Sequence, residues 1–495
     1  MNVIFLSGVW DKVPMRYLGP YVLKHCLKKR GYSCQVIDYC QYFTAEELVE
    51  TVAGFVDSST VCLAMSSTFW SRLSALKTFT HAKGTNNMPN NLYSAVAILK
   101  NQFPNIKIVV GGPNVRNANE IEFLDCIVTG EAEDLLPELL DYWTGAGTEP
   151  EPTVINGLVH YGKCINKQYD ISRCDFAWDE LDCIVDGETL PMETARGCIF
   201  SCKFCAYPHL GKKKFDYLRP NEYIKRHLED NYNKFKVTNY YIVDDTFNDS
   251  EYKIDSFVDI VNSLPFKIGY VCYTRADLVW RFEGMAEKML ASGLMGTFIG
   301  LESLHPKTSL IVGKGWSGKQ AKTYIPELLY QRWQNKVKVQ LGLIVGLPGE
   351  DTESLEQTRL WANEHDLNAI YIPLSLTKDV NDRDYTSVFE RNAERYGYRF
   401  NSAGEWENDI MTNRQSVKIA LRMNNNKTNN TVSSWYHMAM LGLGYEHDEL
   451  MTMDWKHLDS EEFQQREQEF ISKYKTKLKY LKKSELNGIN NTMRD

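Results

Sequence analysis

Three cysteines stand close together in the run Cys198-Ile-Phe-Ser-Cys202-Lys-Phe-Cys205. Their spacing, four residues and then three, brings three thiol groups onto one short loop. A structural zinc site uses four protein ligands, usually as two pairs, and no fourth cysteine stands at a matching distance. Three thiolates instead suit three irons of a cubane iron–sulfur cluster, which leaves the fourth iron open to a small chelating ligand. A zinc knuckle or a chance grouping is the alternative.

The same spacing, with the aromatic Phe204 directly before the last cysteine, resembles the CxxxCxxC signature of radical S-adenosylmethionine (SAM) enzymes. The resemblance implies a 4Fe-4S cluster whose open iron is chelated by the amine and carboxylate of SAM. It further implies that the reduced cluster breaks the C–S bond of SAM, and that the 5′-deoxyadenosyl radical so formed abstracts hydrogen from the substrate. In such enzymes the cofactors carry the chemistry, while the protein supplies orientation and excludes water.

Six apolar runs alternate with helical patterns in residues 189–380 and predict a partial (β/α)6 barrel, of the TIM barrel type. The cysteine loop follows the first run, which places it at the carboxyl ends of the strands, where such barrels hold their active sites. The expected strands are Leu190–Thr194, Asn239–Asp244, Ile268–Thr274, Gly296–Leu301, Val337–Val345 and Ala369–Leu376. The expected helices are Tyr223–Phe235, Ile254–Leu264, Phe282–Ala291, Gln320–Trp333 and Thr352–His365.

Polar residues and glycines gather at the ends of the other expected strands. By resemblance to radical SAM enzymes, Glu302 reaches the ribose of SAM and the Gly342-x-Ile344-x-Gly346 run lines the adenine. Arg275 is expected to meet the SAM carboxylate. Asp244-Asp245 stands where the family has glycine-glycine-glutamate, so backbone or an aspartate is expected to hold the SAM amine. The expected SAM-binding residues are Phe204, Asp244, Arg275, Glu302, Gly342, Ile344 and Gly346; taken singly, each carboxylate is as well explained as a helix cap or surface residue.

Residues 1–143 alternate strand and helix patterns in a way that predicts a Rossmann-like, doubly wound parallel sheet. The expected strands are Asn2–Leu6, Ser33–Ile37, Thr60–Met65, Lys107–Val110 and Cys126–Thr129, with a helix over Tyr17–Arg30. Such sheets bind ligands at the carboxyl ends of their strands. There the loops read Ser66-Ser67-Thr68, Gly111-Gly112-Pro113-Asn114 and Gly130-Glu131-Ala132-Glu133. Small hydroxyl residues and paired glycines let a bulky ligand approach the backbone.

The order of these loops resembles the cobalamin-binding domain that precedes many radical SAM barrels. The resemblance implies that cobalamin is bound by Ser66, Thr68, Gly111, Gly112, Gly130 and Glu131. The loop of residues 7–16 lacks the histidine that ligates cobalt in part of that family, so cobalamin is expected without a protein histidine ligand, or not at all. Residues 73–91 are expected to be an insertion. A vestigial domain with a structural role is the alternative.

The remaining segments carry weaker signals. Residues 144–188 are expected to be a linker, with one more strand around residues 157–161, and residues 381–495 a mainly helical cap domain. The cap is expected to contain helices at Phe389–Phe400, Arg414–Met423, Ser433–Leu443 and Ser460–Lys483 and a solvated tract at Asn424–Asn430. Trp406, Trp435, Tyr436 and His437 are candidates for lining a substrate pocket, although aromatics at helical spacing more often form core.

Composition narrows the class of protein. The 495-residue chain has a formal net charge of −8 and twelve cysteines without a disulfide framework, which fits a reducing cytoplasm. It has no apolar run of about 18 residues, which argues against a membrane span. We therefore expect a cytoplasmic, cobalamin-dependent radical SAM enzyme, foremost a C-methyltransferase. The alternatives are a radical SAM cyclase, rearrangement or epimerisation enzyme without methyl transfer, and a non-catalytic metal-stabilised binding protein. Expected partners are a small metabolite or peptide substrate, favoured over nucleic acid, and an electron donor such as flavodoxin or ferredoxin.

Overall fold

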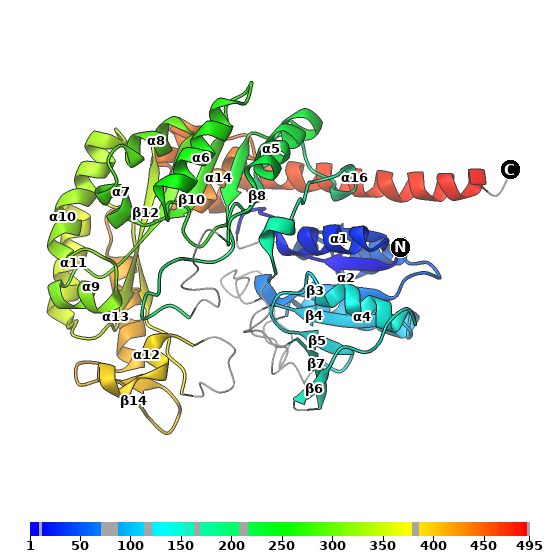
Figure 1. The fold of residues 1–495 in the computed structure, drawn as a ribbon, viewed down its shortest axis with the longest axis horizontal. Helices are drawn as coiled ribbons and strands as arrows, with labels where there is room; N and C mark the ends of the chain where they lie inside the picture. The colour runs from blue at the N-terminus through cyan, green and yellow to red at the C-terminus, as the bar shows by residue number, and fades with distance from the viewer. Residues whose placement is uncertain are drawn as a thin grey trace.

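The computed structural model describes residues 1–8, 12–70, 88–112, 121–155, 157–162, 169–206, 216–378 and 386–492, without the side chains of Phe69 and of residues 482–492. Pro113, Asn114 and most of the expected insertion at residues 73–91 lie outside these residues. Two parallel sheets stand side by side, and the long helix α16 (Glu461–Thr492) runs past both (Figure 1).

The first sheet has seven strands in the order β2-β1-β3-β4-β5-β7-β6, and every neighbouring pair is parallel except β6–β7. The strands are β1 (Val3–Leu6), β2 (Cys34–Ile37), β3 (Cys62–Ser66), β4 (Lys107–Gly111), β5 (Cys126–Val128), β6 (Pro152–Ile155) and β7 (Leu158–Tyr161). Helices α1 (Gly19–Lys29) and α4 (Leu135–Trp143) pack on one face, and α2 (Ala45–Ala53) and α3 (Asn90–Gln102) on the other. The expected doubly wound sheet is confirmed, and its order reverses at β1.

The segment of residues 144–188 is more than the linker expected from its composition. Its residues 152–161 form the β6–β7 hairpin, and β7 continues the first sheet through the parallel pairs Ile127↔His160 and Val128↔Tyr161. Proline at the first residue of an edge strand is tolerated, because no ladder hydrogen bond is lost there. The first sheet therefore ends at this hairpin and not near residue 143.

The second sheet has six strands in the order β13-β12-β11-β10-β9-β8, all of them parallel. The strands are β8 (Leu190–Met192), β9 (Asn239–Ile242), β10 (Gly269–Thr274), β11 (Leu294–Glu302), β12 (Lys338–Val345) and β13 (Ala369–Pro373). The helices are α5 (Asn221–Phe235), α6 (Glu251–Asn262), α7 (Ala276–Arg281), α8 (Met285–Ala291), α9 (Pro306–Val312), α10 (Gly318–Glu327) and α11 (Thr352–Glu364). All six expected strands are present. The helix expected over 282–291 corresponds to α8, and the short helix α7, which was not expected, precedes it.

The two faces of the second sheet pack against different elements. Tyr240, Ile242 and Cys272 point toward the outer helices, whereas the intervening Tyr241 and Val271 point inward and pack with α14 (Ser434–Leu441). In the inner core the Trp435 ring stacks on that of Tyr241 at a centroid distance of 5.8 Å. Helix α14 thus closes the inner face near the amino-terminal ends of the strands. Trp435, Tyr436 and His437 are core residues, at 6 %, 4 % and 0 % exposure.

The C-terminal region departs from expectation at two places. The helix expected over 389–400 is short: α12 spans Val388–Arg391, a 3-10 turn spans Glu394–Tyr396, and β14 (Arg399–Phe400) then pairs with β15 (Trp406–Glu407). Gly397 adopts φ 81°, a left-handed conformation that ends helices.

The expected solvated tract after α13 (Asn413–Asn425) is tied to the second sheet. The side chain of Asn424 accepts a hydrogen bond from the Tyr371 N–H and donates one to the Tyr371 carbonyl, both at 2.9 Å. This amide satisfies backbone groups on the outer edge of β13, the edge strand of the open barrel. Exposed edges invite pairing with other chains, so the contact protects the edge.

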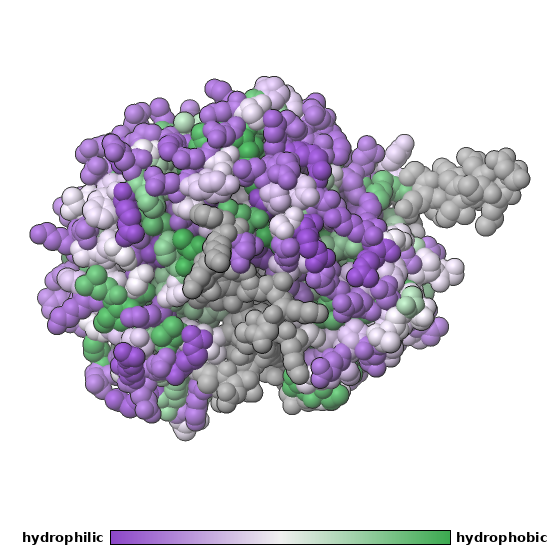
Figure 2. All heavy atoms as spheres, in the orientation of Figure 1, coloured by the Kyte–Doolittle hydropathy of each residue, from purple (hydrophilic) through white to green (hydrophobic). Residues whose placement is uncertain are grey.

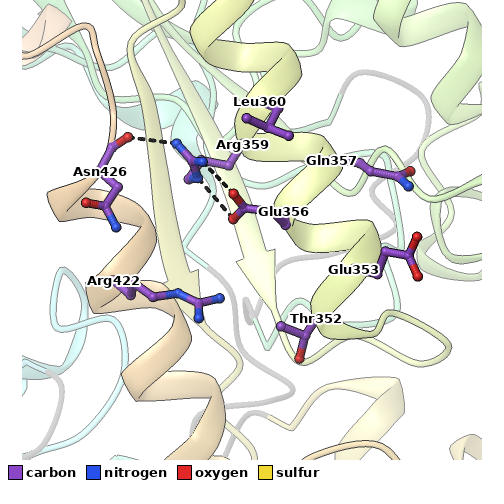
Figure 3. A pocket seen from close by; sticks show the side chains of 8 residues that line it. All are labelled: Thr352, Glu353, Glu356, Gln357, Arg359, Leu360, Arg422 and Asn426. Carbon is purple, nitrogen blue, oxygen red and sulfur yellow. Dashed lines mark hydrogen bonds and ion pairs between the residues drawn. The ribbon is translucent and has the colours of Figure 1, made fainter.

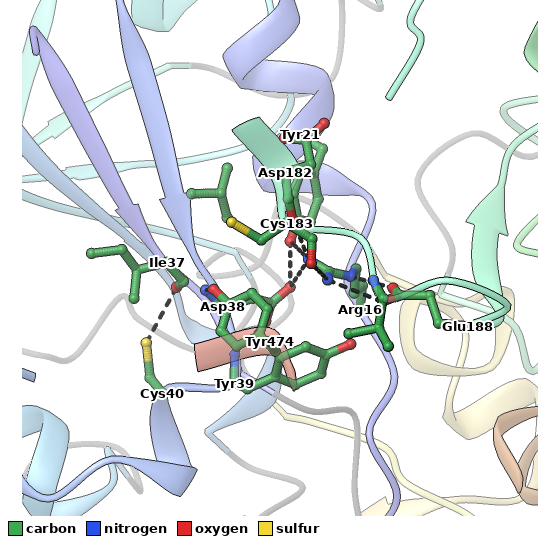
Figure 4. A network of polar contacts seen from close by, with 12 residues as sticks. Arg16, Tyr21, Ile37, Asp38, Tyr39, Cys40, Asp182, Cys183, Glu188 and Tyr474 are labelled. Atoms are coloured by element: carbon green, nitrogen blue, oxygen red, sulfur yellow. Dashed lines mark hydrogen bonds and ion pairs between the residues drawn. The ribbon is translucent and has the colours of Figure 1, made fainter. Parts of the chain in front are cut away.

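Helix α16 packs against the first sheet through Phe470, Ile471, Tyr474 and Leu478. Beneath it, the fully buried guanidinium of Arg16 donates to Glu188 at 2.5 Å and to the Tyr21 hydroxyl, which in turn donates to Asp38 at 2.7 Å (Figure 4). The Asp38 N–H donates to the Tyr474 hydroxyl at 2.7 Å. This network joins the loops after β1 and β2, the segment before β8, and α16.

Hydrophilic residues cover most of the coloured surface in Figure 2. Within the part of the chain that the structure describes, no helix has both the length and the apolar character needed to cross a bilayer.

Candidate functional site

The cysteine loop follows β8, at the carboxyl end of the second sheet, as the sequence predicted. Cys198 and Cys202 are 7 % and 9 % exposed, and Cys205 is half-buried. The Cys205 N–H donates to the Cys202 carbonyl at 3.1 Å and keeps the loop tight. In the described residues no three His, Cys, Asp or Glu side chains converge on one metal ion. A cubane cluster does not require such convergence, because each sulfur binds a different iron.

Two consecutive aspartates after β9 fix the start of this loop. Asp244, 1 % exposed, accepts the N–H groups of Thr194 at 2.7 Å and Ala195 at 3.0 Å and pairs with Lys253 of α6 at 2.9 Å. It therefore positions the loop, and the expectation that it binds SAM stays a prediction. Asp245, part-exposed, accepts the Gly197 N–H at 3.1 Å.

Arg275 lies against a cysteine sulfur. Its Nη1 donates to Cys202 Sγ at 3.2 Å, and its other nitrogens donate to Asp277 at 2.9–3.1 Å and to the Lys314 carbonyl at 2.9 Å. The guanidinium is engaged by the sulfur and by these oxygens, and a contact with the SAM carboxylate stays a prediction. A cationic donor favours the thiolate form that ligates metal. Burial raises the pKa of the Cys198 thiol, which metal ligation would offset.

Glu302 ends β11 in a left-handed conformation with φ 65°, which is uncommon for a residue with a side chain. Such strain collects at ligand sites. Its carboxylate pairs with Lys314 at 3.0 Å, and the Lys314 amine lies 5.7 Å from the centroid of the Phe204 ring. A Cβ on Gly300 would lie 2.6 Å from Glu302 Oε1, so the glycine leaves room for this carboxylate. Lys314 therefore contacts three residues of the candidate site: Phe204 of the cysteine loop, Glu302 and Arg275.

The glycines of β12 leave room for aromatic rings. A Cβ on Gly342 would lie 2.5 Å from the ring of Phe298, on the inner face, where Ile344 is half-buried. Gly346, with φ 109°, packs against Trp406, whose Nε1 donates to the Leu374 carbonyl at 2.8 Å. Trp406 is 1 % exposed and supports the strand end from behind.

Hydroxyl groups form a cradle at the carboxyl end of the first sheet. Gly112 has φ 93°, and a Cβ there would lie 3.0–3.2 Å from the hydroxyl oxygens of Ser66, Ser67 and Thr68. The Ser66 hydroxyl donates to Thr68 Oγ1 at 2.8 Å. Three hydroxyls around an exposed glycine backbone fit a polar nucleotide-like group such as the tail of cobalamin. Gly111, the last residue of β4, and Gly130, with φ 82°, lie at the same edge of the sheet.

An ionic cluster that was not predicted from the sequence joins the two sheets. Arg196, two residues before Cys198, donates to Glu193 through two nitrogens at 2.8 and 2.9 Å. Its Nη1 donates across to Glu131 at 2.9 Å and Glu133 at 2.5 Å in the loop after β5. We call these four residues the Arg196 cluster. Glu131 was expected to bind cobalamin, but its carboxylate is engaged by Arg196 and by the Tyr169 N–H at 2.8 Å.

Glu350 is a buried carboxyl next to this site. It is 2 % exposed and accepts the hydroxyl of Ser303, the residue after Glu302, at 2.5 Å. Its other oxygen has no partner among the described residues. Burial raises the pKa of Glu350 to about 8. The protonated carboxyl thus bridges the loops after β11 and β12 at neutral pH.

We expect Glu350→Gln to change how stability depends on pH. The folded-state pKa lies above the unfolded value of 4.5, so the unfolded chain binds fewer protons between about pH 4.5 and 8, and wild-type stability falls as pH rises through this window. The neutral amide removes that fall. Urea unfolding should show the variant gaining on wild type from pH 6 to pH 9 by about 2–3 kcal/mol. An unchanged difference at the two pH values would contradict a buried neutral carboxyl.

A separate groove of about 720 Å³ lies on the outside of the barrel, between α11 and α13. Figure 3 shows its lining, in which Arg359 pairs with Glu356 at 2.5 Å and Leu360 is 52 % exposed. None of its lining residues belongs to the cysteine loop or to the strand ends described above. This groove is therefore distinct from the candidate active site.

The sequence of this chain is similar to that of known proteins. Residues 192–362 match the model of the Radical SAM superfamily. These residues are therefore similar to a radical SAM domain. Over 304 residues the chain is 24% identical to a protein of Pyrococcus horikoshii named as an uncharacterized methyltransferase, with coverage of 56% of this chain and 62% of that protein. The chain thus spans less than two thirds of that relative.

Solved structures extend the likeness over the N-terminal sheet. The cobalamin-dependent radical SAM enzyme OxsB with aqua-cobalamin bound superposes with a TM-score of 0.56 at 17% identity, over 80% of this chain and 56% of OxsB. The radical SAM methyltransferase TsrM of Kitasatospora setae, with cobalamin and a [4Fe-4S] cluster bound, gives 0.60 at 14% identity, over 96% and 100%. At these identities the likeness is one of fold: a Rossmann-like domain beside a radical SAM domain.

Proposed function

We propose that this chain is a cobalamin-dependent radical SAM enzyme that transfers a methyl group to a carbon of its substrate. The observation that carries the proposal is the Arg196 cluster, in which the loop after β5 reaches the cysteine loop at 2.5–2.9 Å. The carboxyl end of the first sheet therefore lies against the cysteine loop of the second. Ligands bound at the two edges would face each other. The fold shared with OxsB and TsrM supports the same arrangement.

Three sets of residues would hold the groups required. Cys198, Cys202 and Cys205 would hold a 4Fe-4S cluster, Phe204, Glu302, Gly342, Ile344 and Gly346 would contact SAM, and Ser66, Thr68, Gly111, Gly112 and Gly130 would contact cobalamin. When bound, these groups supply one-electron cleavage of the C–S bond of SAM and methyl transfer through cobalt. An external donor such as flavodoxin or ferredoxin would supply the electrons, and the substrate would be a small metabolite or a peptide.

The side chains of the site position the reacting groups. Arg275 donates to Cys202 Sγ and would offset charge on that ligand; hydrogen bonds to sulfur are a known control of cluster potential. Asp244 and Asp245 hold the N–H groups at the start of the cysteine loop. The ion pair between Glu302 and Lys314 ties the end of β11 to the segment that follows α9. Together these contacts fix the cysteine loop before any ligand arrives.

Anaerobic reconstitution tests the proposal. The full-length protein, loaded with iron, sulfide and cobalamin, should form 5′-deoxyadenosine and S-adenosylhomocysteine from SAM and reductant, and retain cobalt through gel filtration. Candidate substrates should gain the mass of a methyl group. Deoxyadenosine without retained cobalt would instead indicate a radical SAM enzyme that does not transfer methyl through cobalamin. No deoxyadenosine with any candidate substrate would indicate a binding protein.

A further inference from the structure

The inner face of the radical SAM domain carries a row of uncharged side chains above α14. Tyr273, Phe298 and Gln340 are register partners on β10, β11 and β12. The Tyr273 ring lies 4.9 Å from that of Trp435 in α14 and 5.6 Å from that of Phe298. Trp435 therefore forms the floor of this face, and the row of three lies between the floor and the strand ends.

Apolar side chains continue this face toward the cysteine loop. Ile344 of β12 pairs in register with Ile372 of β13, and Val243 directly follows the end of β9. Val243 and Ile372 are 39 % and 44 % exposed. Exposed apolar side chains inside a barrel, beside its proposed cofactor site, are surface that a ligand can bury.

Gln340 is the polar exception on this face. It is 8 % exposed, and its side-chain amide is open to the interior of this face rather than fully enclosed. An amide at an apolar site can donate and accept hydrogen bonds and so orient a ligand. The charged groups nearby are already engaged: Glu302 with Lys314, Arg275 with Asp277, and the Lys338 amine with the carbonyls of Leu450 and Met451.

We propose that this face binds the part of the substrate that carries the reacting carbon, and that this part is uncharged and mainly apolar with a single hydrogen-bonding group, which the Gln340 amide recognises. The inference rests on the proposed function, because it takes the face as the substrate side of a radical SAM reaction. An ionised group placed here would lose water without gaining an opposite charge on this face, so a charged substrate would be rejected.

Two fluorescent probes that differ by one charge test the inference. N-phenyl-1-naphthylamine is neutral, and 8-anilino-1-naphthalenesulfonate carries the same rings with an added sulfonate. Titrated anaerobically into full-length reconstituted enzyme with saturating SAM, the neutral probe should bind at least about tenfold more tightly. Ile372→Asp should weaken the neutral probe by about tenfold, because burial of one isoleucine is lost. Gln340→Glu, which is nearly isosteric, should weaken it as well.

Leu360→Asp is the matched control, because Leu360 is 52 % exposed but lines the outer groove of Figure 3. It should leave binding unchanged. Equal or tighter binding of the sulfonate would overturn the inference, as would loss of binding in Leu360→Asp but not in Ile372→Asp. Deoxyadenosine formation by wild type, assayed without probe, reports on the proposed function separately. If it is absent, the proposed function fails, and this face is no substrate site whatever the probes do.

Discussion

Replacing Cys198, Cys202 or Cys205 singly by serine should abolish the iron–sulfur absorbance and lower deoxyadenosine formation by more than about a hundredfold. Loss of an outer-shell partner of a metal site costs 10–100-fold, and loss of a ligand should cost more. Iron and sulfide analysis with chromatographic detection of deoxyadenosine measures both effects in anaerobically reconstituted protein.

Cys26→Ser is the control, because Cys26 is 8 % exposed, as buried as Cys198 and Cys202, but lies in α1. It should keep both iron and activity. Full activity in all three loop variants, or stoichiometric zinc in wild-type protein purified without oxygen, would show that the loop holds no catalytic cluster.

Arg196→Met should destabilise the protein by about 3–5 kcal/mol and reduce iron retention, because it leaves Glu131, Glu133 and Glu193 near one another without their cation. Arg332→Met is the matched control. Arg332 makes a similar two-pronged pair with Glu287 at 2.5–2.7 Å, but Glu287 is 54 % exposed. Solvent screens that pair, and its loss should cost about 0–1 kcal/mol.

Charge removal gives a second check on the Arg196 cluster. Adding Glu131→Gln and Glu133→Gln to Arg196→Met should recover part of the lost stability, since uncompensated charge is the main cost. Chemical unfolding and iron content would be followed in parallel. If Arg196→Met behaves like Arg332→Met in both, the contact between the two sheets does not hold the cysteine loop.

The strands of both sheets could be predicted from the sequence because buried parallel strands appear as short, continuous apolar runs. Thr60–Met65 and Val337–Val345 were each located to within two residues of β3 and β12. The β6–β7 hairpin was only partly foreseen, because the Pro- and Gly-rich composition before it indicated a linker. The helix expected over 389–400 was wrong, because α12 already ends at Arg391, where Asn392 leaves the helical conformation, and Gly397 then ends the following 3-10 turn.

The candidate site was predictable in position but not in every contact. The cysteine motif and the ends of the expected barrel strands together predicted where the cysteine loop and Glu302 lie. Asp244 is engaged by Thr194 and Ala195, 50 and 49 residues away, and Glu131 by Arg196, 65 residues away. Such partners are set by tertiary packing, which no local pattern encodes. Spacing therefore identifies the chemistry, and folding decides which side chains remain free to perform it.

The buried network of Figure 4 has a consequence for biosynthesis. The bond between Asp38 and Tyr474 spans 436 positions of the chain. While the nascent chain is still on the ribosome, the Asp38 N–H and the apolar face that α16 will cover stay exposed until α16 emerges. Contacts of such long range form late, and surfaces that remain exposed until then are prone to aggregate. We therefore expect chaperones that shield the first sheet until α16 is synthesised to raise the yield of folded protein.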